Sequence, residues 1–172
     1  FALQGMRVIG FAEKRFNRAG LAMEDCAQGF EFTGLQAMID PPRTEVIEAI
    51  RACHQAGITV KMITGDHMGT AQAIGEQLGI AKPGAQAVTG LQLAAMDEAA
   101  LREIVKDHNV FARVAPEHKL GLVRALQANG QVTAMTGDGV NDAPALKQSN
   151  IGVAMGITGT SVSKEAADIV LT

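Results

Sequence analysis

Short apolar runs alternate with polar, glycine-containing loops and with helical patterns through most of this 172-residue chain. The predicted strands are residues 6–11, 30–39, 58–63, 110–113, 132–135, 151–155 and 169–171. The predicted helices are residues 44–55, 69–78, 97–107, 116–128, 143–148 and 161–167. Strands that alternate with helices pair in parallel through crossover connections, with helices on both faces. The order therefore predicts an α/β fold built on an open, mostly parallel sheet.

Local signals support several of these boundaries. Two prolines, Pro41 and Pro42, end the run at residues 30–39, which is apolar enough to predict a buried strand. Asn129 and Gly130 stop the helix that begins at Pro116. Residues 12–29 are predicted to be irregular, so we expect a domain boundary near residue 30.

The stretch AMTGDGVNDAPA at residues 134–145 predicts a strand, a tight loop and a helix start. Asp138 and Asp142 lie four residues apart, and the glycines around Asp138 let the backbone turn sharply. Asp142 is placed to cap the helix that follows. Two carboxylates at a strand end beside a helix N-terminus suit a hard cation and a phosphate. The alternative is a solvated turn followed by a simple helix cap.

In open parallel sheets the ligand site lies beyond the carboxyl ends of the strands. This rule predicts that Thr64, Arg113, Asp138 and Asp40 share one rim. Thr64, Gly65 and Asp66 join a predicted strand to a helix, where a hydroxyl and backbone N–H groups can bind an anion. The alternative is that Thr64 or Asp66 only caps the helix.

Two further polar side chains are candidates for the same site. Lys119 lies in the first turn of a predicted helix, where a cation is poorly matched to the helix dipole and needs a phosphate or carboxylate nearby. Asn141 could donate to a phosphate oxygen. A solvated surface lysine and a turn asparagine are the simpler alternatives.

Composition excludes several classes of function. The net charge is −3 and the chain has no Trp or Tyr, which argues against nucleic acid as a partner. The four histidines show no HExxH spacing, and neither GxxxxGK[ST] nor GxSxG occurs. We interpret the glycine-rich residues 156–160 as a flexible turn. Two cysteines without CxxC spacing fit a reducing cytosolic setting. No apolar run approaches the 18 residues expected of a transmembrane helix.

Four motifs together resemble the phosphorylation domain of a P-type (E1–E2) cation-transporting ATPase. They are MIDPPR at residues 38–43, MITGDH at 62–67, FARVAPEHK at 111–119 and MTGDGVNDAPAL at 135–146. The resemblance assigns residues 30–172 to that domain, without its N-terminal DKTGT segment, and residues 1–29 to the closing segment of the inserted nucleotide-binding domain and a linker. The family fold is the Rossmann-like fold of the haloacid dehalogenase-like superfamily.

The resemblance also implies roles for individual residues. Asp138 and Asp142 would be the metal residues, with Mg²⁺ as cofactor. Thr64, Gly65, Asp66, Lys119 and Asn141 would bind the phosphoryl group, and Thr64 and Lys119 would be catalytic. Arg113, Asp40 and Arg43 would lie towards the nucleotide, with ATP as the substrate. Charge stabilisation of this kind is what phosphoryl transfer requires.

The chain departs from the family in lacking DKTGT, the motif whose aspartate becomes phosphorylated. We therefore expect a piece of a membrane pump that lies on the cytoplasmic side and is inactive alone. Its partners would be the actuator and nucleotide-binding domains and, through absent transmembrane helices, the transported cation. DPPR and the segment from residue 156 resemble type II pumps, so we expect Ca²⁺ first and Na⁺ or K⁺ second. The alternatives are a stand-alone haloacid dehalogenase-like phosphatase and a non-catalytic module that binds nucleotide or Mg²⁺.

Overall fold

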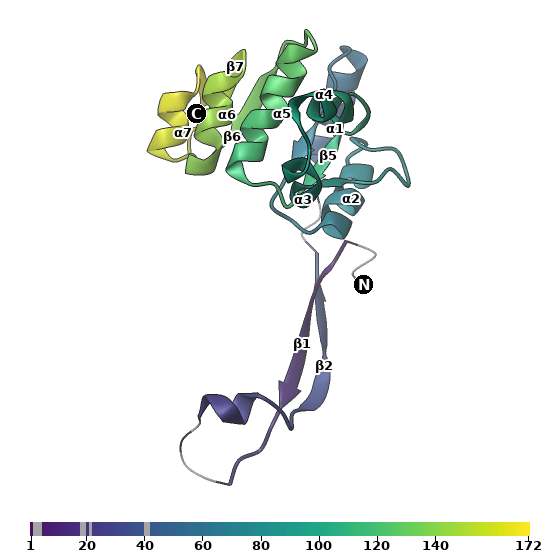
Figure 1. The fold of residues 1–172 in the computed structure, drawn as a ribbon, viewed down its shortest axis with the longest axis vertical. Coiled ribbons are helices and arrows are strands. Elements are labelled where there is room, and N and C mark those ends of the chain that lie inside the picture. The colour runs from purple at the N-terminus through teal and green to yellow at the C-terminus, as the bar shows by residue number, and fades with distance from the viewer. Residues whose placement is uncertain (2–4, 18–19, 21, 40–41) are drawn as a thin grey trace.

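A hairpin and two small parallel sheets with their helices make up the computed structural model, which describes residues 1, 5–17, 20, 22–39 and 42–172. The hairpin consists of β1 (Arg7–Glu13) and β2 (Glu31–Met38), which pair antiparallel with a register shift between Phe11 and Ala12. It extends away from the body that contains the helices (Figure 1). The pairing of β1 with β2 thus joins residues on either side of position 30, near which we expected a domain boundary.

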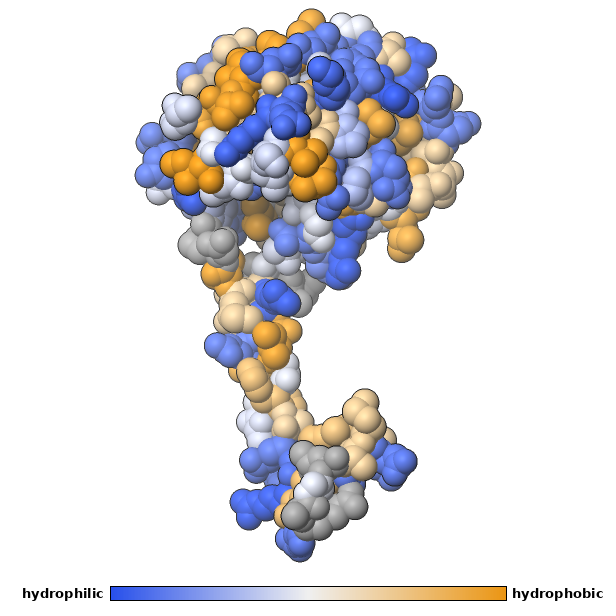
Figure 2. All heavy atoms as spheres, turned by 90° about the vertical axis from the view of Figure 1, so that its left-hand side faces the viewer, coloured by the Kyte–Doolittle hydropathy of each residue, from blue (hydrophilic) through white to orange (hydrophobic). Residues whose placement is uncertain are grey.

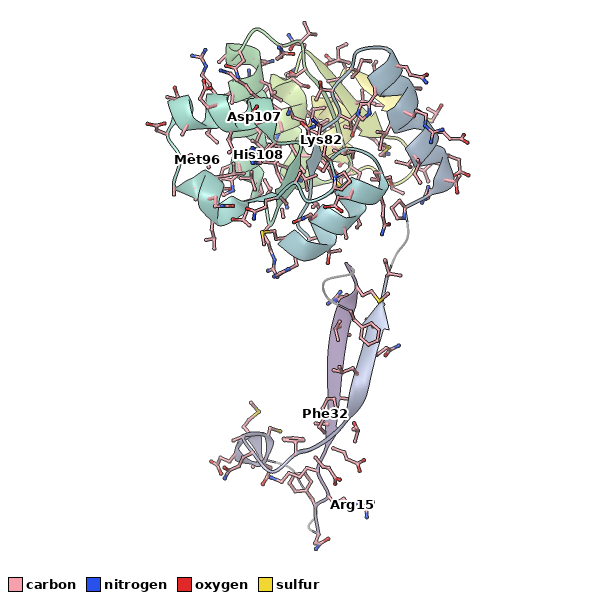
Figure 3. The ribbon with its side chains drawn as sticks, turned by 90° about the vertical axis from the view of Figure 1, so that its right-hand side faces the viewer. Arg15, Phe32, Lys82, Met96, Asp107 and His108 are labelled. Atoms are coloured by element: carbon pink, nitrogen blue, oxygen red, sulfur yellow. The ribbon has the colours of Figure 1, made fainter. Side chains whose placement is uncertain are left out.

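The prediction of a buried strand at residues 30–39 is wrong. Most side chains of β2 are exposed, and Phe32 keeps 65% of its surface accessible on the projecting hairpin (Figure 3). Figure 2 shows apolar residues along this hairpin between hydrophilic ones. The physical reason is that β2 pairs only with β1 among the described residues, and no described helix covers either face. At the hairpin tip, which we expected to be irregular, a short 3₁₀-helix η2 (Met23–Cys26) forms.

The first parallel sheet has the strand order β3-β5-β4, formed by β3 (Met62–Ile63), β5 (Val110–Ala112) and β4 (Val88–Thr89). Val110 and Ala112 face a core shared with α1 (Thr44–Gln55) and α2 (Met68–Gln77). Phe111 faces the opposite core, shared with α3 (Gly90–Ala94), α4 (Glu98–Asp107) and α5 (Pro116–Ala128). Because neighbouring strand residues point to opposite faces, helices cover both sides of this sheet, as predicted.

The second parallel sheet has the order β6-β7-β8, formed by β6 (Ala134–Gly137), β7 (Ile151–Met155) and β8 (Ile169–Leu171). Gly152 and Ala154 are buried on the face that packs against α6 (Ala143–Gln148) and α7 (Ser161–Ala166). The other face, which carries Ile151, stays partly exposed. Within the described part of the chain, helices therefore cover this sheet on one side only.

The sequence-based fold class is confirmed, with corrections to single strands. Apart from the antiparallel hairpin of β1 and β2, the strands lie in two parallel sheets of three instead of one sheet. β3 is shorter than predicted because its partner β5 begins only at Val110. The apolar run at residues 132–135 would suit a central strand buried on both faces, but β6 is an edge strand. β7 is its one described neighbour, and Val132 before it is 82% exposed. The predictions missed β4 and α3. Across the described ranges, no helix is long and apolar enough to cross a membrane.

Candidate active site

The carboxylate of Asp142 organises the loop that follows β6. Its Oδ2 atom accepts hydrogen bonds from the backbone N–H groups of Gly139, at 3.0 Å, and Asp138, at 3.3 Å. This contact requires a glycine at position 137, where an added Cβ would lie only 2.6 Å from the Cβ of Asp142. Asp142 does occupy the N-cap position of α6, but its side chain makes no capping bond there. The expected cap is therefore wrong, because the carboxylate turns back to the preceding loop.

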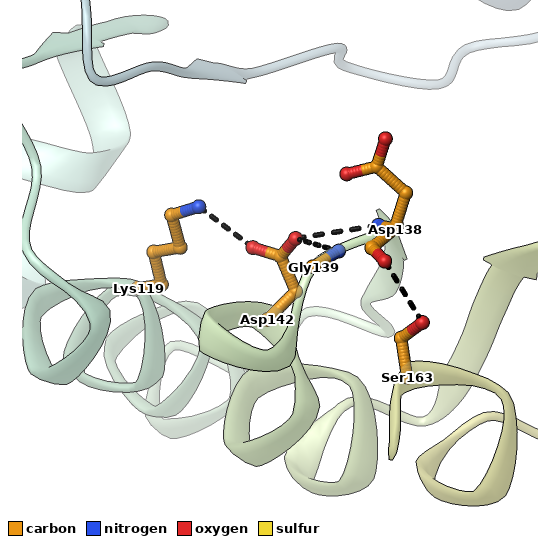
Figure 4. Close-up of polar contacts among 5 residues, drawn as sticks. All are labelled: Lys119, Asp138, Gly139, Asp142 and Ser163. Carbon is orange, nitrogen blue, oxygen red and sulfur yellow. Dashed lines mark hydrogen bonds and ion pairs between the residues drawn. The ribbon is translucent and has the colours of Figure 1, made fainter. Parts of the chain in front are cut away.

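Lys119 provides the second contact to this carboxylate. Its Nζ atom donates to Asp142 Oδ1 at 2.6 Å, and the two side chains are only 18% and 10% exposed (Figure 4). The carboxylate expected near this lysine is thus Asp142. Burial alone would raise the pKa of Asp142, but the hydrogen bond and charge of Lys119 and the two backbone N–H groups lower it overall. Asp142 is therefore ionised at neutral pH and forms a true ion pair.

Asp138 differs from Asp142 because its carboxylate is exposed. Figure 4 shows this side chain projecting from the loop, and it accepts no hydrogen bond from any residue that the structure describes. Its main-chain carbonyl, in contrast, accepts from the Thr160 N–H at 2.8 Å and from the Ser163 hydroxyl at 3.0 Å. The neighbouring Asn141 is also exposed. The loop therefore has a fixed backbone and a carboxylate that is free to bind a ligand.

The loop after β3 forms a second group of polar residues. The Thr64 hydroxyl donates to Asp66 Oδ2 at 3.0 Å and accepts from the Asp66 N–H at 3.1 Å. The backbone of this loop is joined to the end of β5, since Asp66 O accepts from Arg113 N–H and Thr64 O accepts from Val114 N–H. Gly65 is exposed, with open space where a Cβ would lie. The Thr64 hydroxyl and the Asp66 N–H, which could both bind an anion, thus form hydrogen bonds within their own turn.

Arg113 is the only described non-glycine residue with a positive φ, at 53°. A left-handed conformation costs free energy for a residue with a Cβ, and such strain is often found at functional sites. The strained backbone brings the Arg113 carbonyl against Gly90, where an added Cβ would collide with the carbonyl oxygen. The side chain of Arg113 remains exposed at the end of β5.

The predicted site residues therefore form two groups. Thr64, Asp66 and Arg113 meet at the first sheet, and Lys119, Asp138 and Asp142 meet at the second. α5 connects them, because it starts just after Arg113 and carries Lys119 to Asp142. Arg43 is exposed at the N-cap of α1, at a distance in sequence from both groups, and Asp40 lies outside the described residues.

The carboxylates at the second sheet fit a Mg²⁺ ion, which commonly binds one or two carboxylates and completes its coordination shell with water and substrate phosphates. Asp138 offers an unused carboxylate of this kind. Among the residues with described positions, no three His, Cys, Asp or Glu side chains form a complete metal cluster.

Sequence reasoning missed Thr160 and Ser163. We interpreted residues 156–160 as a flexible turn, but the Thr160 side chain caps α7 by accepting from the Ser163 N–H. The serine and threonine spacing before a helix could have indicated that cap. The contact of Ser163 with Asp138 links residues 25 positions apart, so no local pattern could have indicated it.

Comparison with known proteins identifies the family of this chain. Residues 7–150 match the haloacid dehalogenase-like hydrolase family. The chain is 56% identical over 174 residues to the cation-transporting ATPase pma1 of Synechocystis, and this match covers 99% of the chain and 19% of that protein. It is 50% identical to calcium-transporting ATPase 1 of Bacillus cereus, covering 98% of the chain and 19% of the relative.

A third relative, the probable cation-transporting ATPase F of Mycobacterium tuberculosis, is 62% identical over 144 residues, or 81% of the chain and 16% of that protein. The chain thus spans less than a fifth of the length of these relatives. The first two matches extend over nearly the whole chain. The chain therefore belongs to the haloacid dehalogenase-like hydrolases, in the form that is found within cation-transporting P-type ATPases.

Proposed function

We propose that this chain is the part of an ATP-driven cation pump that supplies Mg²⁺ and phosphate contacts to the phosphorylation site. The phosphorylated aspartate lies in another segment, because DKTGT does not occur in these 172 residues. The observation that best supports this function is the buried Lys119–Asp142 pair beside the exposed carboxylate of Asp138. A simple turn and helix cap would need neither the buried lysine nor the free carboxylate.

Each polar group has a distinct role in this proposal. Asp138 binds Mg²⁺ directly. Asp142 supports that loop and holds Lys119, whose ammonium group has three N–H donors and uses one on Asp142. The remaining donors of Lys119 can bind a phosphoryl oxygen as negative charge develops there. Fixed donors of this kind stabilise a transition state without reorganising during the reaction.

The first sheet completes the phosphate site in this proposal. Thr64 and Gly65 hold the phosphoryl group, with Asp66 as the partner that orients the Thr64 hydroxyl. Asn141 donates to the same group. Arg113, Asp40 and Arg43 lie on the nucleotide side, where ATP is the substrate. Bound Mg²⁺ would neutralise phosphate charge and so assist the transfer.

The wider assignments are part of the same proposal and rest on the resemblance to cation pumps. We place residues 30–172 in the phosphorylation domain and residues 1–29 in the closing segment of the nucleotide-binding domain and its linker. The pump lies in a membrane, with this domain on the cytoplasmic side in contact with the actuator and nucleotide-binding domains. Ca²⁺ is the first choice of transported ion, because the relative in Bacillus cereus is named for calcium transport. Na⁺ or K⁺ is the second.

Mg²⁺ titration of the chain tests the metal role. We expect saturable binding, detected by NMR shifts of the amide groups at residues 138–142, and loss of that binding in Asp138→Asn. The matched control is Asp107→Asn, which removes an exposed carboxylate at the end of α4 (Figure 3) and should bind Mg²⁺ like the unchanged chain. Equal Mg²⁺ binding by Asp138→Asn and the control would overturn the assignment.

Phosphorylation by labelled ATP tests the position of the nucleophile. The 172-residue chain should form no acid-stable phosphoprotein, whereas a full-length pump that contains it should form one. Stimulation of that phosphoprotein by Ca²⁺, compared with Na⁺ and K⁺, then identifies the ion. An acid-stable phosphoprotein formed by the chain alone would show that the nucleophile was misplaced.

A further inference from the structure

The main-chain carbonyl of Asp138 is held by two donors from a distant segment. Thr160 N–H, 22 residues further along the chain, donates to it at 2.8 Å. The Ser163 hydroxyl, 25 residues further along, donates to it at 3.0 Å (Figure 4). The Asp138 N–H is held as well, because it donates to Asp142 Oδ2. Both peptide groups that flank the Asp138 Cα are therefore fixed, and only the side chain is free.

Ser163 is fully buried, with 0% of its surface exposed. Its hydroxyl accepts from Thr160 Oγ1 at 3.1 Å and shares its own proton between Asp138 O and Thr160 O, the latter at 2.9 Å. Capping does not explain this hydroxyl, since the Thr160 side chain already accepts the Ser163 N–H at the start of α7. Burying a hydroxyl is unfavourable unless it forms hydrogen bonds. The Ser163 hydroxyl thus connects α7 to the Asp138 loop.

The loop needs such a restraint because of its composition. Gly137 and Gly139 flank Asp138, and glycine has the largest backbone freedom of any residue. Without the donors on its carbonyl, the peptide between Asp138 and Gly139 would be held only by the hydrogen bond from Gly139 N–H to Asp142 Oδ2, and the direction of the Asp138 carboxylate would be less restricted. We propose that Ser163, together with the Thr160 N–H, is a positioning residue that holds Asp138 in its Mg²⁺-binding direction. This inference rests on the proposed role of Asp138 and extends it to α7.

Substitution of Ser163 tests the proposal in the 172-residue chain with Mg²⁺ as the probe. Ser163→Ala removes one hydrogen bond to the loop, so we expect Mg²⁺ binding to weaken about fivefold, the effect of one ordinary hydrogen bond. Ser163→Cys retains a weak donor of similar size and should recover part of the affinity. The matched control is Ser149→Ala, which removes another buried hydroxyl that donates to a main-chain carbonyl, that of Leu146 at 2.7 Å.

Hydrogen exchange gives a second readout that a purely structural serine would not affect. Coupling between two sites is reciprocal: if Ser163 strengthens Mg²⁺ binding, bound Mg²⁺ must also stabilise the contact of Ser163 with the loop. Mg²⁺ should therefore slow hydrogen exchange of the Ser163 amide in the unchanged chain. The protection should disappear in Asp138→Asn. This measurement also keeps the proposal testable if Ser163→Ala folds poorly.

The outcomes separate the two proposals. An unchanged chain that does not bind Mg²⁺ overturns the metal role of Asp138 and this inference with it. Normal Mg²⁺ binding by both Ser163→Ala and Ser149→Ala, with no protection of Ser163, overturns the role of Ser163 alone. Weaker binding confined to Ser163→Ala, with Mg²⁺-dependent protection of α7, supports both.

Discussion

The two parallel sheets of this protein are stabilised in different ways. In the first sheet, all three residues of β5 are buried between helices on opposite faces. In the second sheet, β8 is exposed throughout and β6 is half exposed, with described helices on one face. The Asp138 loop extends from this second, less covered sheet. Its conformation therefore depends on specific hydrogen bonds and an ion pair more than on apolar burial.

Because of this difference, we expect the two sheets to lose stability through different kinds of substitution. Apolar truncation should reduce stability mainly in the first sheet, because cavity formation is costly only where the site cannot collapse or admit water. Loss of charge or of a hydroxyl should have its main effect in the second sheet, where buried polar groups depend on their partners. Four measurements can test this contrast.

The largest effect is expected for Phe111→Ala in the first sheet. Phe111 of β5 is 1% exposed in the core shared with α3, α4 and α5, so we expect the free energy of unfolding to fall by about 4 kcal/mol. The matched control is Phe32→Ala on the hairpin, which should cost less than about 1 kcal/mol because Phe32 is mainly exposed. Urea denaturation measures both, and similar losses for the two variants would contradict the contrast.

The next effect is expected for Lys119→Met in the second sheet. This change keeps the apolar stem but leaves Asp142 charged and buried, at a cost of about 3 kcal/mol in unfolding free energy. Lys106→Met is the control, since Lys106 and Glu103 also pair at 2.7 Å but are 50% and 73% exposed. An exposed pair contributes less than about 1 kcal/mol. If the two variants lost equal stability, Lys119 would not have a buried structural role.

A direct comparison of the sheets uses one substitution at two positions. Val110→Ala in β5 removes two buried methyl groups and should cost about 2 kcal/mol. Val170→Ala in β8 removes the same groups from a side chain that is 40% exposed, so its cost should be under about 1 kcal/mol. Thermal unfolding followed by circular dichroism would rank them. The reverse order would contradict the stronger burial of the first sheet.

The smallest effect is expected from pH. The folded state keeps the pKa of Asp142 below its ordinary value of 3.8, so the stabilisation by this pair is fully present above pH 3.8. It is lost as the pH falls through the lower folded pKa, where the carboxylate becomes protonated. Unfolding free energies measured from neutral to acid pH should show this loss, and Lys119→Met should reduce its size. An identical acid dependence in both proteins would rule out Lys119 as a cause.

Much of the fold could be predicted where single residues give local signals. The bounds of α1, α5 and α6 were predicted correctly, since proline near the helix start or glycine after the end limits each of them. The missed helix α3 also had a signal, because Thr89 and Gln92 form a capping box. The two-residue strand β4 had none, since its residues form a strand only by pairing with β5.

The candidate site was predictable in its residue types but not in its contacts. The motifs around Thr64, Lys119 and Asp138 indicated phosphate and metal chemistry. The sequence did not indicate that Lys119 pairs with Asp142, that Asp142 turns back to the loop instead of capping α6, or that Arg113 adopts a positive φ. Each of these depends on atoms brought together from different elements.

The sequence by itself determined the alternation of strands and helices, the glycine-flanked aspartates and the family, because these depend on local propensity and on residue order. Only the tertiary structure decided which carboxylate is free and which is paired, and that Ser163 of α7 holds the Asp138 carbonyl. The physical reason is that hydrogen bonds and ion pairs depend on distances of about 3 Å. Residues that are 23 or 25 positions apart reach such distances only after the helices have packed on their sheets.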